Sequence, residues 1–182
     1  GITGSREIAF FRKLAPGIRY KFTGNLIGLP DDFVAHGNLS SKTGEIDVDV
    51  LLKNDNSRNG YLIQGFAESR DFNVGEVMSN KMIGKVSMNA AMEILCEKKD
   101  GVDITIDSVK ISKVEFNDYP YSNIFAIGKY NNRMFDGRII CHDPNLDFIF
   151  QGLFSVDTKA ATSKYNFYAD IPYANLSALN ID

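Results

Sequence analysis

The chain has 182 residues, of which 44% are hydrophobic and 24% are charged, enough for one domain with a core or for two small β units. This composition excludes an intrinsically disordered chain. The net charge of −3, the pI of about 5.4 and the interspersed acids and bases provide no basic surface for nucleic acid. We therefore expect no nucleic-acid partner.

No stretch of the sequence approaches the roughly 18 consecutive apolar residues that a membrane-spanning helix needs. The first residue is Gly1 rather than Met, so the lack of a signal peptide says nothing about the compartment. The two cysteines, Cys96 and Cys141, lack CxxC spacing, which argues against a metal or redox site. Each is expected to be a small buried residue, with a disulfide between them as the alternative.

Residues 5–14 are predicted to form a short helix, because Ser5 can cap its first turn and apolar residues follow at helical spacing. Pro16 and Gly17 end that helix. Further along, residues 71–78 could form a single helical turn or a short helix between strands.

From residue 19 onward the dominant hydrophobic period is two, which is typical of antiparallel strands with one buried and one wet face. The clearest alternation is in residues 45–50, 86–89, 103–107, 110–112 and 146–150. Turn chemistry separates such segments, at Thr43–Gly44, Asn59–Gly60, Asp100–Gly101, Asn117–Asp118, Asn131–Asn132 and Asp136–Gly137. The pattern predicts about a dozen short strands.

Internal similarity suggests that one hairpin unit is reused along the chain. Residues 33–39 with 44–46 resemble 124–130 with 137–139, and 63–65 resemble 150–152. Repeated strand units that cannot close a core alone predict an elongated sheet. Chance similarity among short strands is the alternative interpretation.

The candidate chemistry is sparse. His36 and His142 have no second histidine, cysteine pair or HExxH motif nearby, and residues 142–145 are better explained as a turn around Pro144. No GxSxG elbow or P-loop is present. The paired carboxylates Asp47 and Asp49 are explained by the solvent face of an alternating strand. We therefore expect a non-catalytic protein with no metal and no cofactor.

Two aromatic segments, 119–121 and 165–168, could form a sugar-stacking platform, although packing within the sheet explains them better and the chain has no Trp. The alternative function is thus a cell-surface carbohydrate-binding or adhesion β-sandwich. A hydrolase on a β scaffold would instead require two carboxylates roughly 5 to 9.5 Å apart across a cleft.

The order of several longer motifs resembles the AsmA-like/TamB translocation-and-assembly module family, over nearly the whole chain. The most specific motif is VEFNDYPYSNI at 114–124, followed by FDGR at 135–138, DPNL at 143–146 and FQG at 150–152. Other matching segments are 8–11 with 20–28, 72–75 with 84–89, and 165–170 with 174–176. Cys96 and the Lys98–Lys99 stretch lie outside the family's motifs.

The resemblance implies an internal segment of a large periplasmic protein of the cell envelope, anchored in the inner membrane. It implies lipid transport between membranes or outer-membrane protein assembly, with phospholipid or another acyl chain as cargo. Outer-membrane assembly proteins would be partners through regions outside this fragment.

We expect an all-β, mainly antiparallel curved and elongated sheet, trough-like, built from tandem hairpin units, with a short N-terminal helix. Residues 1–182 would form one β-rich segment, with helix and linker at 1–18, a first β unit at 19–70 and a second at 71–182. Apolar strand faces would line a groove or fill a closed core. The candidate groove residues are Ile46, Val48, Val50, Val86, Met88, Ile104, Ile106, Phe148 and Phe150.

Overall fold

The computed structural model describes residues 18–29, 31–55, 57, 60–97, 102–131, 134–155 and 165–181. The helix predicted at residues 5–14 lies outside these ranges. The described residues form one short helix, α2 (Val74–Met78), and ten strands. The strands are β1 (Lys21–Leu29), β2 (Asp32–Ser41), β3 (Gly44–Asp55), β4 (Gly60–Asn73), β5 (Ile83–Glu97), β6 (Val102–Phe116), β7 (Tyr119–Asn131), β8 (Met134–Asp143), β9 (Leu146–Ser155) and β10 (Tyr165–Ala174).

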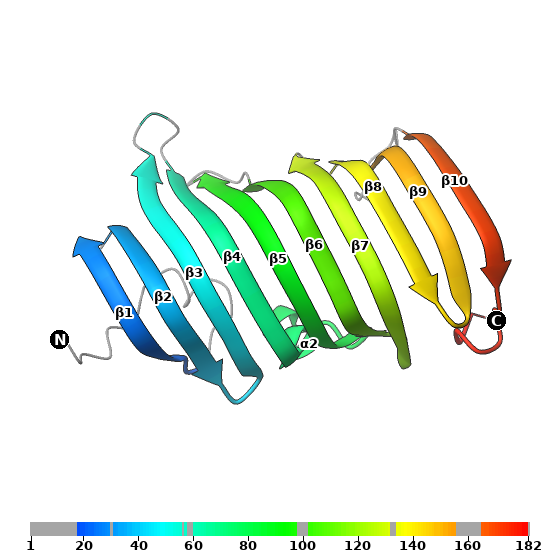
Figure 1. Ribbon diagram of the computed structural model, residues 1–182, viewed down its shortest axis with the longest axis horizontal. Helices are drawn as coiled ribbons and strands as arrows, with labels where there is room; N and C mark the ends of the chain where they lie inside the picture. The colour runs from blue at the N-terminus through cyan, green and yellow to red at the C-terminus, as the bar shows by residue number, and fades with distance from the viewer. Residues whose placement is uncertain are drawn as a thin grey trace.

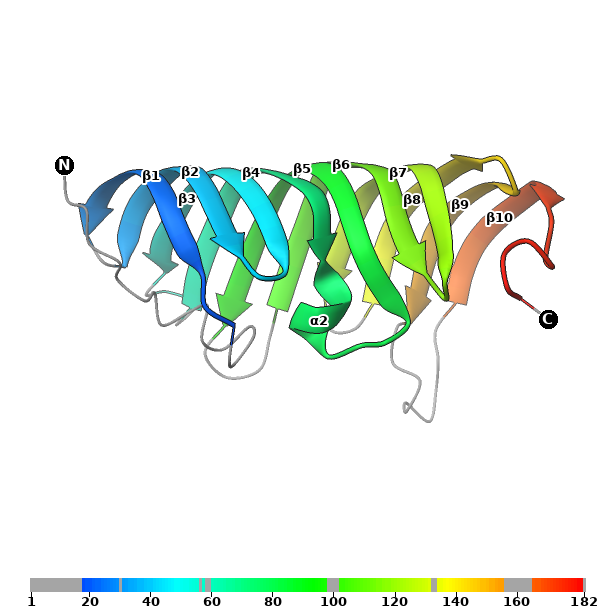
Figure 2. The ribbon, with the colours of Figure 1, turned by 90° about the horizontal axis from the view of Figure 1, so that it is seen from below.

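All ten strands belong to one antiparallel sheet, and each strand pairs with its neighbours in the chain (Figure 1). Seen from below, the sheet arches like a vault, with α2 beneath it (Figure 2). The predicted all-β, mainly antiparallel curved sheet is therefore confirmed. The predicted boundary between residues 70 and 71 falls inside β4, beside the bulge between Ser69 and Phe72.

Short turns keep the strand order simple. Asn117 and Asp118 join β6 to β7 with φ angles of 51° and 61°, the left-handed conformation that tight hairpins need. The turn predicted at Thr43–Gly44 is also present, with Gly44 opening β3. Because strands that are adjacent in the sheet are consecutive in the chain, the sheet is a series of hairpins in chain order.

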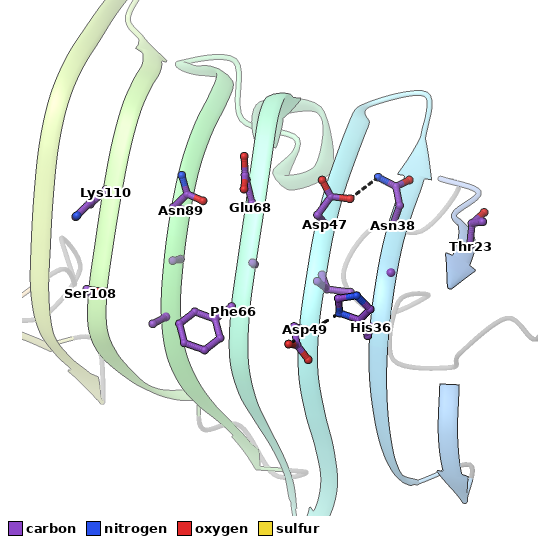
Figure 3. Close-up of a pocket in the computed structure, with 15 residues that line it drawn as sticks. Thr23, His36, Asn38, Asp47, Asp49, Phe66, Glu68, Asn89, Ser108 and Lys110 are labelled. Atoms are coloured by element: carbon purple, nitrogen blue, oxygen red, sulfur yellow. Dashed lines mark hydrogen bonds and ion pairs between the residues drawn. The ribbon is translucent and has the colours of Figure 1, made fainter. Parts of the chain in front are cut away.

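The two faces of the sheet differ in chemistry. In β3, Ile46, Val48 and Val50 are half-buried, while the acids between them are exposed. The polar side chains drawn in Figure 3 lie on the side of the sheet away from α2. Because α2 lies beneath the arch in Figure 2, the polar face is convex and the apolar face is concave.

Helix α2 covers only the second part of residues 71–78, where a helical turn or short helix was considered, because residues 71–73 belong to β4. Asn73 caps it by accepting a hydrogen bond from the Glu76 N–H at 3.0 Å, and Ser79 ends it with a φ of 53°. Lys42 forms an ion pair with Glu76, and the Asn73 N–H donates to the Thr43 carbonyl at 2.7 Å. These contacts hold α2 against the turn between β2 and β3.

Asp143, the last residue of β8, connects the first residues of β7 with the turn between β8 and β9. It is buried, and its carboxylate accepts hydrogen bonds from the Tyr119 hydroxyl at 2.5 Å and from the Ser122 N–H and hydroxyl, both at 2.8 Å. The Asn145 N–H donates to it at 2.9 Å. Burial alone would raise the pKa of Asp143, but these hydrogen bonds outweigh burial and lower it.

The last described residues, 175–181, pack against the turns at the same ends of these strands. Leu179 is fully buried there. Asn180 and Asn117 exchange two hydrogen bonds, each side-chain amide donating to the other's backbone carbonyl, at 2.8 and 3.0 Å. The Asn175 N–H donates to the Asn145 carbonyl at 2.9 Å. This segment therefore ties the β6–β7 turn to the β8–β9 turn.

The Asp143 network predicts an acid-sensitive contribution to stability. Asp143→Asn places an amide donor against N–H donors, so we expect the free energy of unfolding to fall by about 1–3 kcal/mol at pH 7. Because the folded-state pKa lies below the usual 3.8, the contribution is present above that pH and is lost as the pH falls through the folded value.

Urea unfolding at pH 7 and at pH 3 measures this difference. The stability gap between wild type and Asp143→Asn should narrow at the lower pH, and the exposed Asp136→Asn serves as the control. Equal stability of Asp143→Asn and wild type at pH 7 would show that the network does not stabilise the fold.

Candidate functional site

The strand registers place all nine predicted groove residues on the concave face. One transverse row across the sheet contains Ile46, Met88 and Phe148. The next row contains Val48 and Phe150. Residues far apart in sequence are therefore aligned across the floor of one trough.

The other four predicted residues occupy three more rows on the same face. Val50 and Ile106 share a row, and Ile104 lies in the row beyond it. Val86 pairs with Phe72 near α2. Phe148 and Phe150 lie on β9, three strands away from Ile104 and Ile106 on β6, so the nine line a long surface rather than one compact cluster.

No second sheet packs on this face within the described part of the chain. There, extended contacts between elements join only neighbouring strands, and α2 with β5. Of the nine residues Val86 is buried and the other eight are half-buried, shielded by their neighbours on the curved face. The concave apolar surface is therefore a trough of half-buried side chains.

The sequence interpretation missed several residues that line the same rows. Four of them are aliphatic or thioether side chains, namely Ile63, Met92, Ile94 and Ile139. Each stands at an alternating position of its strand, so the period-two pattern could have identified it. Ile63, Met92 and Ile94, together with the predicted residues, make the β3–β6 part of the trough mostly apolar without aromatic rings, whereas Ile139 lies on β8.

Aromatic rings fill the β8–β10 part of the trough. Phe150 contacts Phe154 edge to face with ring centroids 5.2 Å apart, and it also contacts Phe167 at 5.1 Å. Phe135 contacts Phe154 at 5.5 Å. These rings pack against one another, so the protein's own side chains occupy this part of the trough. In the aliphatic part, Val50 and Ile63 likewise pack against the buried cluster of Phe33, Ala35 and Leu52.

A row of glycines runs across the concave floor. Gly128, Gly137 and Gly152 are directly paired across β7, β8 and β9. Gly152 has a φ of 135°, and a Cβ there would lie 2.6 Å from the Cα of Phe167. The positive φ and the close backbone approach both require glycine, and such positions let strands bend.

The turn predicted at Asp136–Gly137 is wrong, because both residues lie inside β8. Gly137 is there for close approach rather than chain reversal, since a Cβ would lie 2.7 Å from the Cα of Gly128 and from Cζ of Phe135. The ring of Phe135 covers the space that the missing side chain leaves.

The convex face carries an open depression of about 680 Å³ across β1–β6, lined by polar side chains and by apolar ones such as Phe66. Figure 3 shows the exposed ring of Phe66 beside Asp49. The imidazole Nδ1 of His36 lies 3.9 Å from the Asp49 carboxylate, and Asn38 donates to Asp47 at 3.0 Å. These residues are the solvent face that the alternating pattern predicted.

The isolated candidates for chemistry have structural roles. The turn predicted at residues 142–145 is present, and Nδ1 of His142 lies 2.8 Å from the carboxylate of its cross-strand partner Asp147. Within the described ranges, no three His, Cys, Asp or Glu side chains are placed to hold a metal ion. No helix among the described residues is long and apolar enough to cross a membrane.

Both cysteines are free thiols on the concave face, so the disulfide alternative is not formed. Cys141 is fully buried on β8, whereas Cys96 is half-buried on β5. Burial raises the pKa of each thiol, which disfavours the reactive thiolate. Both cysteines therefore act as small apolar residues.

Comparison of the chain with family models, curated proteins and solved structures finds no match.

The glycine row predicts a position that does not tolerate a side chain. Gly152→Ala should lower the free energy of unfolding by about 1–3 kcal/mol, since an L-residue is strained at this positive φ and its methyl group meets the β10 backbone. Urea unfolding measures the change, with the exposed neighbour substitution Gln151→Ala as control. Wild-type stability for Gly152→Ala would contradict this account of the bend.

Proposed function

We propose that the chain is a non-catalytic segment that binds acyl chains in its concave trough. One observation carries the proposal: an apolar, curved sheet face that no second sheet covers within the described residues. A soluble protein rarely leaves such a surface without a ligand or partner. The aliphatic β3–β6 part, lined by residues such as Val48 and Ile106, is the proposed binding surface.

The chemistry of the trough suits an extended hydrocarbon. Aliphatic side chains offer no hydrogen bonds, so they select for apolar area rather than for a polar headgroup. Transfer of a methylene group from water to such a surface is favourable by about 0.8 kcal/mol. An acyl chain that places several methylene groups on these side chains would gain this free energy for each one, so binding needs no catalytic group.

The resemblance of the sequence motifs to the AsmA-like/TamB family supplies the proposed setting. The segment would work in the periplasm as part of a larger cell-envelope protein anchored in the inner membrane. It would take part in lipid transport between membranes or in outer-membrane protein assembly. Phospholipid is the proposed cargo, and outer-membrane assembly proteins would be contacted through other regions.

The alternative, a carbohydrate-binding or adhesion β-sandwich, has less support. The described strands form one sheet rather than two packed sheets. Of the two aromatic segments considered for sugar stacking, 119–121 is turned inward, because Tyr121 is buried and its ring contacts Tyr119 at 4.7 Å, edge to face. Segment 165–168 is different, since Tyr165 and Tyr168 are 62% and 63% exposed. The single sheet therefore argues against a sandwich, and the exposed rings of β10 are the surface that a sugar would contact in this alternative.

The proposal predicts that concave substitutions weaken lipid binding. The double variant Val48→Thr/Val50→Thr keeps side-chain shape but replaces a methyl group with a hydroxyl at two positions of the trough. We expect affinity for a dansyl-labelled fatty acid to fall about tenfold, since each lost methyl contact weakens binding by roughly 0.8 kcal/mol. Native mass spectrometry of purified protein should show bound phospholipid in the wild type and less in the variant.

The matched control is Val34→Thr/Ile127→Thr, two exposed positions on the convex face. This control should bind like the wild type, and thermal unfolding checks that both double variants are folded. Equal affinity of the concave and convex variants would refute the trough as the binding surface. Absence of lipid, together with selective retention on a glycan array, would favour the carbohydrate-binding alternative.

A further inference from the structure

The two outer strands of the sheet carry apolar side chains on both faces. In β1, Leu26 on the concave face is 47% exposed and Ile27 on the convex face is 73% exposed. In β10, Phe167 and Tyr168 occupy the same two faces and are 50% and 63% exposed. Within the described residues β1 pairs only with β2, and β10 only with β9.

An outer strand of this kind is a template for another strand. Its outward backbone N–H and C=O groups have no partner strand in the sheet, and natural proteins usually protect such edges with charges, proline or bulges. In β10 the bulge between Asp170 and Tyr173 and the proline at position 172 protect only the second half. In the described structure, residues 165–169 of β10 and residues 22–29 of β1 carry no charge, proline or bulge.

The strand directions fit these two edges to each other. Ten antiparallel strands in sequential order leave β10 running opposite to β1. A second copy, shifted along the sheet without rotation, therefore brings its β1 antiparallel to β10. The concave face of one copy then continues the concave face of the next.

One register of the β10–β1 pair places each residue of β10 opposite the β1 residue that occupies the same transverse row of the sheet. Side-chain sizes match in this row-continuing register. Phe167 lies in the row of Leu26, and Tyr165 lies in the row of Gly28. An aromatic residue would thus face a glycine across the new pair, as Phe33 already faces Gly28 within the sheet.

Charge favours the same arrangement. Lys21 near the start of β1 and Asp170 near the middle of β10 both lie on the convex face. In the row-continuing register Asp170 is opposite Thr23 of the second copy and diagonal to its Lys21, a distance at which opposite charges on neighbouring strands attract.

We propose that the chain associates head to tail, with β10 of one copy adding antiparallel to β1 of a second copy. The contact is heterologous, so each copy uses two different edges and assembly extends the trough. This inference goes beyond acyl-chain binding and does not depend on it, because the edge contacts form whether or not the trough holds a ligand.

Edge-blocked variants test the proposal. Leu26→Lys/Ile27→Lys blocks β1, and Phe167→Lys/Tyr168→Lys blocks β10, since lysine on an edge strand opposes pairing. Sedimentation velocity of the wild type should show masses rising with concentration in multiples of 20.3 kDa. Each variant alone should stay at the mass of one chain, and an equimolar mixture should form a species of two chains and nothing larger.

The mixture distinguishes the possible edge pairings. In a head-to-tail contact the β1-blocked chain still offers β10, and the β10-blocked chain still offers β1, so together they form a closed pair. Self-association of either variant alone would show a symmetric edge contact and overturn the proposal. A wild type that remains a single chain up to about 200 µM, well above ordinary specific affinities, would also overturn it. Circular dichroism confirms that both variants retain the sheet.

Discussion

The structure depends on a period-two alternation of apolar and polar side chains that stays in register across the sheet. Because side chains of a strand alternate between faces, a constant register gathers the apolar ones on one side. Ile46 in β3 and Phe148 in β9 are thus in one row although about a hundred residues separate them. A shift of one residue in any pairing would move the remaining apolar side chains to the convex face.

Curvature turns this apolar face into a trough. Glycines such as Gly152 and the bulges in β4 to β6 bend strands that would otherwise form a flatter, twisted sheet. The concave face crowds its side chains, which explains why most are half-buried although no second sheet covers them within the described residues. Asp143 and Leu179 hold the turns that connect β6 to β7 and β8 to β9. The aliphatic rows between β3 and β6 are the surface that we propose for acyl chains.

Most of the fold could be predicted from the sequence, because the alternation and the turn residues are local signals. The concave position of all nine candidate residues followed from the same alternation. The turn expected at Asp136–Gly137 failed because Asp-Gly also occurs where two backbones approach closely, and only the pairing of Gly137 with Gly128 reveals this. Curvature and the filling of one end by Phe150 and Phe167 depend on long-range packing, which no local pattern encodes.

Photolabelling with a diazirine fatty acid tests the central claim most directly, because it reports which face of the folded chain contacts the hydrocarbon. Peptide mapping should place the label on concave residues of β3–β6, such as Met88, Met92 and Ile106, and unlabelled fatty acid should compete. Labelling confined to convex residues such as Phe66, or labelling that excess fatty acid does not reduce, would contradict the account.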